Sequence, residues 1–137
     1  MKESETEEIN KLEQNSHQPF LTSVLNAWKG VIAMVRDERN FRIEIAGAVI
    51  SFALAGFFNF PLWKWTTIIL TISLVLTAEA INSAVESLVD LIHPETHPLA
   101  GRVKDMAAGA VLIAFLISVI IGVLLYGPPL YQLLSTH

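Results

Sequence analysis

Five polar side chains recur at helical spacing in the segment LTAEAINSAVESLVD at residues 76–90. Relative to the first, the others follow at three, four, seven and eleven residues, so a helix places them on one face. They are Glu79, Asn82, Ser83, Glu86 and Asp90. Ionisable groups at membrane depth are costly and normally face a cavity, a partner or a substrate path. A solvated helix end accounts for Asp90 and is an alternative for Glu86, but it fits Glu79 and Asn82 poorly because they follow an apolar run.

Carboxylates one or two turns apart on a helix suit hard cations such as Mg²⁺, which take oxygen ligands. Two further segments add charges: Glu38 belongs to DERNFR at residues 37–42, and Lys104 stands beside Asp105. These are the groups that phosphoryl transfer to a hydroxyl requires. A proton- or cation-coupled transporter would also need a membrane carboxylate, so both functions stay open on these residues alone. The absence of a Walker A or glycine-rich nucleotide motif excludes the usual soluble kinase folds.

The composition indicates a membrane protein. Of 137 residues, 53% are hydrophobic and 16% are charged, against about 25% charged in a soluble domain. Cysteine is absent, which excludes disulfides and thiolate metal sites. Residues 1–16 hold five Glu and two Lys, so −3 of the net charge of −4 lies there and −1 remains elsewhere. We therefore expect an acidic, poorly ordered tail at residues 1–18, no signal peptide and no nucleic-acid binding.

The remaining pattern predicts an all-α membrane protein with a surface helix and three spans. The helix at residues 20–37 carries apolar residues at helical spacing, so it lies in the membrane interface or packs as an ordinary amphipathic helix on protein. The spans are expected at about residues 43–63, 65–93 and 105–126, within an integral-membrane domain at 19–127 followed by a short tail at 128–137.

Turn residues and interfacial residues bound these spans. Asn59-Phe60-Pro61 is expected to close the first span, and Gly127-Pro128-Pro129 to stop the third. Trp63 and Trp65 flank Lys64, which is typical of an aromatic belt with a charged anchor. Small residues along the first span, Ala46 to Ala48 and Ala53 to Gly56, favour close approach of another helix.

The basic residues predict the orientation. Six of the nine Lys and Arg precede the first span, two lie between the second and third spans, and Lys64 lies on the opposite side. The positive-inside rule then puts the N-terminus and the polar side chains of residues 79–90 on the cytoplasmic side and the C-terminus outside.

Four stretches resemble the bacterial integral-membrane diacylglycerol kinase and undecaprenol kinase family. They are EAINSAVESLVD at 79–90, GRVKDMAAGAVL at 101–112, WKG at 28–30 and ERNFRIE at 38–44, and the resemblance covers residues 20–127. It implies a homotrimer of three-span subunits with active sites shared between neighbours. It also implies transfer of the γ-phosphoryl group of ATP, with Mg²⁺, to the hydroxyl of a membrane lipid. The resemblance further implies that the membrane is the bacterial cytoplasmic membrane.

The resemblance also implies roles for individual residues. Glu79 would be the general base for the lipid hydroxyl, and Asn82 would orient groups around the transfer site. Trp28 on the surface helix would border lipid and nucleotide. The residues implied to hold Mg²⁺ and ATP are Glu38 and Glu86 for the metal, Lys104 and Asp105 for the nucleotide, and Glu95 and His97 in an ATP-contacting loop where Thr96 replaces the family's common aromatic residue.

The resemblance implies that the lipid is undecaprenol or diacylglycerol. The stretches AAGAVL at 107–112, YGPPLY at 126–131 and RDERN at 36–40 resemble the undecaprenol kinases of Gram-positive bacteria more closely. A small oligomeric transporter with Glu79 as its coupled carboxylate is a further alternative. It would not need Glu38, Glu86, Lys104 and Asp105 on one side of the membrane.

Overall fold

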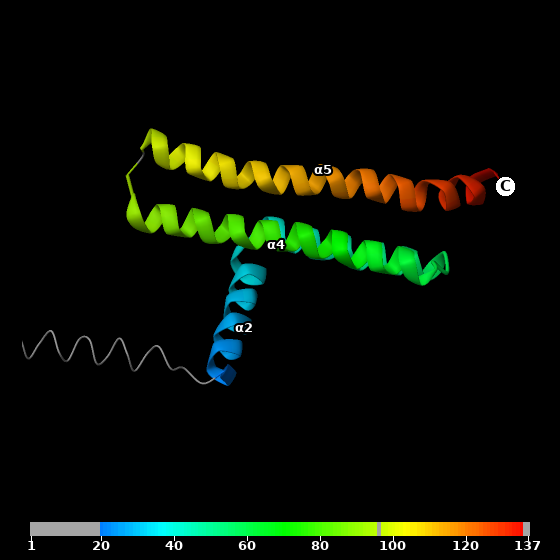
Figure 1. Ribbon diagram of the computed structural model, residues 1–137, viewed down its shortest axis with the longest axis horizontal. Helices are drawn as coiled ribbons and strands as arrows, with labels where there is room; N and C mark the ends of the chain where they lie inside the picture. The colour runs from blue at the N-terminus through cyan, green and yellow to red at the C-terminus, as the bar shows by residue number, and fades with distance from the viewer. Residues whose placement is uncertain (1–19, 96, 136–137) are drawn as a thin grey trace, which may run out of the picture. The chain divides into compact units, whose positions relative to one another are not determined.

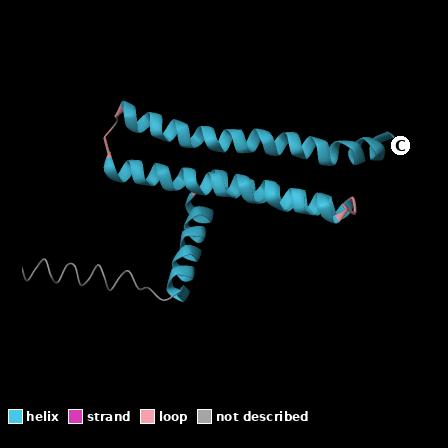
Figure 2. Ribbon diagram, in the orientation of Figure 1, coloured by secondary structure: helices cyan, strands magenta, loops and turns pink. Residues whose placement is uncertain are grey.

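The computed structural model describes residues 20–95 and 97–135, and that part of the chain is helical apart from short connections (Figure 2). The helices are α2 (Phe20–Asp37), α3 (Arg39–Phe57), α4 (Leu62–Ile92) and α5 (Pro98–Ser135). The chain divides into two units, Met1–Asp37 and Glu38–His137, so α2 belongs to the first and α3 to α5 to the second. The all-α prediction is confirmed, whereas the predicted acidic tail and Thr96 lie outside the described residues.

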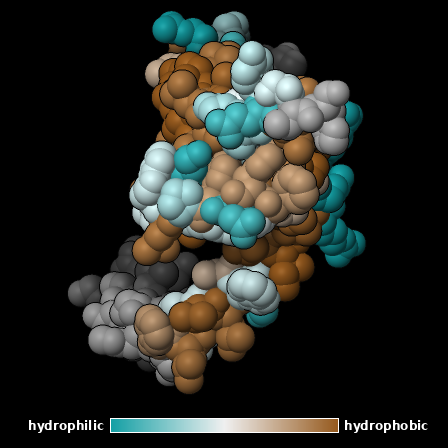
Figure 3. Space-filling view, turned by 90° about the vertical axis from the view of Figure 1, so that its right-hand side faces the viewer, coloured by the Kyte–Doolittle hydropathy of each residue, from teal (hydrophilic) through white to brown (hydrophobic). Residues whose placement is uncertain are grey.

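Helices α3, α4 and α5 are each long and apolar enough to cross a membrane. At about 1.5 Å per residue, the 31 residues of α4 extend about 46 Å, beyond the roughly 30 Å of a hydrocarbon core. Helices α4 and α5 run side by side in opposite directions (Figure 1). Brown apolar side chains make up much of the surface seen in Figure 3. Because many large apolar side chains are exposed in the single chain, lipid or other protein chains must cover them.

A tight turn joins α3 to α4, as the Asn59-Phe60-Pro61 sequence predicts. Asn59 has a φ of 50°, in the left-handed region that asparagine tolerates better than most residues. The amide of Phe60 donates back to the Ala55 carbonyl at 3.0 Å, which closes the end of α3. Pro61 then precedes the first turn of α4, where its missing N–H costs no helical hydrogen bond.

Small and apolar residues at seven-residue spacing bury the faces on which α3 and α4 pack. On α3 these are Phe41, Ala48 and Ala55, and on α4 they include Ile68 and Val75. Within this chain the expected close approach of a helix applies to Ala48 and Ala55, whereas Ala46 and Ala53 are exposed. A Cβ built on Gly47 or Gly56 would meet no described atom within 4 Å.

The end of the bundle near the α3–α4 turn is held by an aromatic cluster. The Phe60 and Tyr126 rings stack with centroids 5.1 Å apart, and the Tyr126 hydroxyl donates to the Ser51 carbonyl at 2.8 Å. Trp63 is exposed, as an interfacial residue should be. Trp65 differs from the prediction because it packs on the core, with its indole N–H donating to the Phe60 carbonyl at 3.1 Å.

Helix α5 runs through the two prolines that were predicted to stop it. The prediction that Gly127-Pro128-Pro129 ends the helix is therefore wrong, since α5 continues to Ser135. The residues three and four positions after Leu125 are both prolines, so the helix offers its carbonyl neither of the usual donors. The Lys64 ammonium lies 3.5 Å from that carbonyl oxygen and supplies a donor from α4. The same ammonium lies 4.2 Å from the centroid of the Phe60 ring.

Candidate active site

The five polar residues of α4 that share one face, which we call the polar stripe, continue the buried face of this helix. They are Glu79, Asn82, Ser83, Glu86 and Asp90. Ile68 and Val75 are buried on that face, and Glu79 and Asn82 follow Val75 at four and seven residues, so they point the same way. Glu79 is 2% exposed and Asn82 is 7% exposed, and the neighbouring Ser83 is also buried. These side chains therefore face the interior of the bundle, and a solvated helix end does not describe them.

The start of α3 contributes the groups around Glu79. The Asn40 side chain is a hydrogen-bond partner of the Glu79 carboxylate, and both Glu38 and Glu86 lie close enough to interact with its charge. Glu44, one turn further along α3, also interacts electrostatically with Glu79. Residues 38–44 and 79–86, far apart in sequence, therefore form one acidic cluster, which we call the acidic site. Its members are Glu38, Asn40, Glu44, Glu79, Asn82 and Glu86.

Glu38 occupies the N-cap position of α3 in an extended conformation, with φ −96° and ψ 115°. Its carboxylate makes no capping hydrogen bond in the described part of the chain. Cap residues usually satisfy the first amides of the helix with their side-chain oxygens. The Glu38 carboxylate is therefore available to the acidic site, as the prediction of a metal ligand requires.

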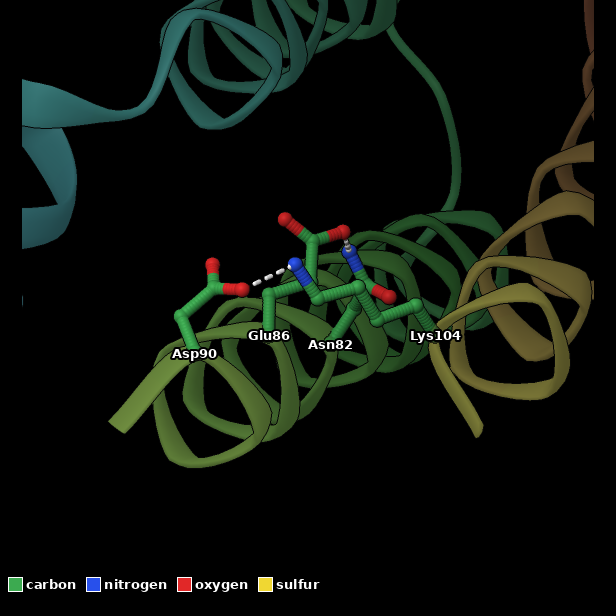
Figure 4. Close-up of polar contacts among 4 residues, drawn as sticks. All are labelled: Asn82, Glu86, Asp90 and Lys104. Carbon is green, nitrogen blue, oxygen red and sulfur yellow. Dashed lines mark hydrogen bonds and ion pairs between the residues drawn. The ribbon is translucent and has the colours of Figure 1, made fainter. Parts of the chain in front are cut away.

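Asn82 fixes Glu86 within the stripe. The Asn82 side-chain amide donates to Glu86 Oε1 at 2.8 Å, one turn along α4 (Figure 4). The oxygen of the same amide, Asn82 Oδ1, is buried and has no hydrogen-bond partner among the described residues. Burying an acceptor without a donor costs free energy. Asn82 Oδ1 is therefore suited to accept a hydrogen bond from a substrate or a water molecule.

Lys104 reaches from α5 to the same face of α4. Its ammonium lies 2.5 Å from Asp90 Oδ1, one turn beyond Glu86 (Figure 4). The Lys104 side chain is 34% exposed, whereas Asp105, the other predicted nucleotide residue, is exposed. The structure thus brings Lys104 to the end of the stripe and gives Asp90 the partner that the sequence did not reveal.

Two further predicted site residues are Glu95 and His97, and the described contacts of His97 lie outside this network. Glu95 and His97 are exposed on the connection between α4 and α5. The His97 ring stacks on His93 with centroids 5.5 Å apart, and His97 Nδ1 accepts a hydrogen bond from the Leu99 amide at 3.2 Å. Trp28 is exposed on α2, which belongs to the other unit.

An apolar cavity of about 340 Å³ begins one turn before Glu79. Residues of α3, α4 and α5 line it, among them Gly47, Val75, Leu76 and Gly122, together with the carboxyl group of Glu44. Glu44 Oε2 is buried without a hydrogen-bond partner within the described residues. The cavity therefore combines largely apolar walls with an unpaired hydrogen-bond acceptor close to the acidic site.

The donor set of the acidic site fits a hard divalent cation only together with other oxygen ligands. Within residues 20–95 and 97–135, no three carboxylate or imidazole groups converge tightly enough to hold a metal ion by themselves. Glu38 and Glu86 supply carboxylate oxygens, which Mg²⁺ accepts alongside water and nucleotide phosphates. The residues therefore suit a metal that arrives with a nucleotide better than one held permanently.

Two residues of the acidic site, Asn40 and Glu44, and the neighbouring Asp90 were given no role from the sequence. A carboxylate in a span is a functional candidate on energetic grounds, so Glu44 could have been found by that signal. Asn40 and Asp90 carried no such signal, because their roles depend on contacts with α4 and α5 that local sequence does not encode.

Helices long and apolar enough to span a membrane carry one buried carboxylate, with further carboxylates and a lysine near it and an apolar cavity beside it. This combination is typical of a membrane-embedded enzyme that acts on an amphiphile. The sequence model of prokaryotic diacylglycerol kinase matches residues 25–126. The chain belongs to the prokaryotic diacylglycerol kinase family, and it is a lipid kinase. This membership removes the transporter alternative.

Individual relatives carry two different names. The chain is 37% identical over 117 residues to the undecaprenol kinase of Bacillus subtilis (strain 168), which covers 85% of this chain and 95% of the relative. It is 39% identical over 116 residues to a diacylglycerol kinase of Synechocystis, covering 84% of this chain and 66% of that protein. It is 37% identical over 94 residues to the diacylglycerol kinase of Escherichia coli (strain K12), and the match covers 69% of this chain and 77% of that protein.

Proposed function

We propose that this protein transfers the γ-phosphoryl group of MgATP to the hydroxyl of undecaprenol, giving undecaprenyl phosphate. The observation that carries the proposal is the burial of Glu79, 2% exposed, where the apolar cavity meets the acidic site. A lipid alcohol keeps its chain in the apolar phase, so the base that activates it must lie at that boundary.

Glu79 is the proposed general base. Its carboxylate receives the hydroxyl proton while the lipid oxygen bonds to the γ-phosphorus and the bond from that phosphorus to the ADP oxygen breaks. The Asn40 side chain orients the Glu79 carboxylate through their hydrogen bond. The unpaired Glu44 Oε2 offers the lipid hydroxyl or a water an acceptor at the mouth of the cavity.

Glu38 and Glu86 would hold Mg²⁺ together with the nucleotide phosphates. Such a metal offsets the phosphate charge and orients the transferred group. The hydrogen bond from Asn82 keeps Glu86 in one orientation, so one of its oxygens stays turned away from that bond. Lys104 then neutralises phosphate charge from the side of α5, and Asp105, Glu95 and His97 contact the rest of ATP.

Undecaprenol is favoured over diacylglycerol as the acceptor. The relative named undecaprenol kinase is matched over 95% of its length, whereas the diacylglycerol kinases of Synechocystis and Escherichia coli are matched over 66% and 77%. The segments 107–112 and 126–131 resemble the undecaprenol branch as well. Diacylglycerol, giving phosphatidic acid, is the second candidate because several relatives carry that name.

The proposed assembly is a homotrimer in the bacterial cytoplasmic membrane with its active sites on the cytoplasmic side. Exposed apolar side chains on α3 and α5 and the open space around Gly47 and Gly109 support contacts with further subunits. Helix α2, with Trp28 exposed, would lie on the cytoplasmic membrane surface and border the lipid and the nucleotide.

The decisive test is a lipid-phosphorylation assay on purified protein in mixed micelles with Mg²⁺ and γ-labelled ATP. Undecaprenol and diacylglycerol are compared at matched mole fractions, with Glu79→Gln as the inactive control. We expect label in both lipids only where Glu79 is intact, and a higher kcat/KM for undecaprenol. A higher kcat/KM for diacylglycerol would assign the second candidate, and label in neither lipid would overturn the proposal.

A further inference from the structure

Asp90 and Lys104 form an ion pair that joins the cytoplasmic-side ends of α4 and α5. The Lys104 ammonium lies 2.5 Å from Asp90 Oδ1. The two partners differ in exposure, because the Lys104 side chain is 34% exposed and that of Asp90 is 65% exposed. An ion pair this open to water contributes little to fold stability. The main effect of the ion pair is therefore to hold the Lys104 side chain in one position.

The pair holds the ammonium over the stripe that carries Glu86. Asn82, Glu86 and Asp90 follow one another at intervals of one helical turn on α4, and Lys104 crosses from α5 to the last of them (Figure 4). A lysine side chain has four flexible carbon–carbon bonds and a point charge, so by itself it does not fix the position of its ammonium. Asp90 supplies that fixed point.

An ammonium has three N–H donors, and a single carboxylate oxygen occupies one of them. The other two remain for oxygens that arrive beside Glu86. A phosphate group bound there would find Lys104 already placed, without the loss of side-chain freedom that a free lysine would suffer on binding.

We propose that Asp90 is a positioning residue for nucleotide binding, which holds the Lys104 ammonium beside Glu86 ready for the phosphates of ATP. The proposal rests on the proposed function and extends it to a residue that neither transfers a proton nor binds the metal. It acts on the nucleotide through Lys104.

The first test compares Asp90→Asn with the wild type in steady-state lipid phosphorylation. We expect KM for MgATP to rise about 3- to 10-fold while kcat changes less than about twofold, since only positioning is lost. Asp90→Glu, which keeps the charge, should recover most of the loss. Asp37→Asn is the matched control, because Asp37 is also exposed and ion-paired, to Arg36 at 3.7 Å. An unchanged KM in Asp90→Asn would overturn the proposal.

The second test asks whether Asp90 acts through Lys104. In a Lys104→Met background, Asp90→Asn should raise KM for MgATP no further, whereas an equal rise in both backgrounds would overturn the proposal. The thermal unfolding midpoint should stay the same in Asp90→Asn, and a large fall would assign Asp90 a structural role instead.

Calorimetric titration of MgATP separates this proposal from the proposed function. Weaker MgATP binding in Asp90→Asn than in the wild type supports the positioning role even if neither lipid is phosphorylated. Normal lipid phosphorylation with identical MgATP binding by both proteins would overturn the role of Asp90 alone. A wild-type protein that binds no MgATP would overturn both.

Discussion

The side-chain amide of Asn82 donates a 2.8 Å hydrogen bond to Glu86 Oε1, so Asn82 holds one of the two proposed metal ligands in place. Asn82 is 7% exposed, and the bond therefore forms largely away from competing water. A carboxylate that is fixed before the nucleotide arrives loses less freedom on binding, which is the general advantage of a preorganised site.

Asn82→Leu should damage catalysis without unfolding the protein. The substitution has a similar volume but leaves Glu86 without its donor, so we expect kcat/KM for MgATP to fall about 10- to 100-fold, as when a partner of a metal ligand is removed. Steady-state assays measure the fall, and Thr67→Val, a polar-to-apolar change on α4 outside the acidic site, is the control. A kcat/KM within about twofold of the wild type would contradict this role.

Glu79→Gln should abolish turnover while MgATP binding persists. The amide is nearly isosteric but accepts no proton, so kcat should fall about 100- to 10,000-fold. Calorimetric titration with MgATP should give an affinity within about threefold of the wild type. An equal loss of nucleotide binding would instead make Glu79 a metal ligand.

Glu38→Gln and Glu86→Gln should each increase the Mg²⁺ concentration required for half-maximal rate, by about tenfold or more. Each removes one carboxylate from the proposed metal ligands, while the apolar cavity stays unchanged. KM for the lipid is therefore the internal control and should not move. Mg²⁺ dependence identical to that of the wild type would remove both residues from the metal site.

Lys64→Met should destabilise the protein through the carbonyl of Leu125. Leu125 is buried, and the residues that would normally donate to its carbonyl are Pro128 and Pro129. Loss of the Lys64 donor at 3.5 Å leaves that oxygen unpaired, at a cost of about 1–3 kcal/mol. Thermal and SDS-induced unfolding in detergent measure the difference.

Pro129→Ala is the matched second variant for this prediction. The alanine supplies the missing N–H to Leu125, so Lys64→Met should cost about 1 kcal/mol less in that background. Some cost should remain, because Lys64 also lies over the Phe60 ring at 4.2 Å. Strictly additive effects of the two substitutions would show that the ammonium does not replace the helical donor.

Much of this fold follows from the local sequence. An apolar run long enough to span a membrane, the turn residues around Asn59, and the spacing of the stripe from Glu79 to Asp90 are all properties of neighbouring residues. They predict helices, their connection and a common direction for the side chains. The burial of Glu79 and Asn82 confirms that direction.

The rest depends on contacts between helices that local patterns do not contain. Pro128 and Pro129 predict a helix stop because the sequence does not reveal that Lys64 lies beside the Leu125 carbonyl, to which the two prolines cannot donate. Asp90 resembled a solvated helix end for the same reason, since its partner Lys104 comes from the next helix. The roles of Glu95, His97 and Trp28 stay predictions.

The acidic site and the packing of α4 share one helical phase, because Glu79 and Asn82 lie on the face that buries Ile68 and Val75. A single residue inserted between Val75 and Glu79 would turn the carboxylates by about 100° and point them into lipid. Seven inserted residues would restore their direction to within about 20° but move them about 10 Å along the helix axis. The distance from the buried apolar face of α4 to the reacting groups can therefore change only in steps that keep the helical phase, whereas a length change at the other end of α4, before Ile68, leaves the two in register.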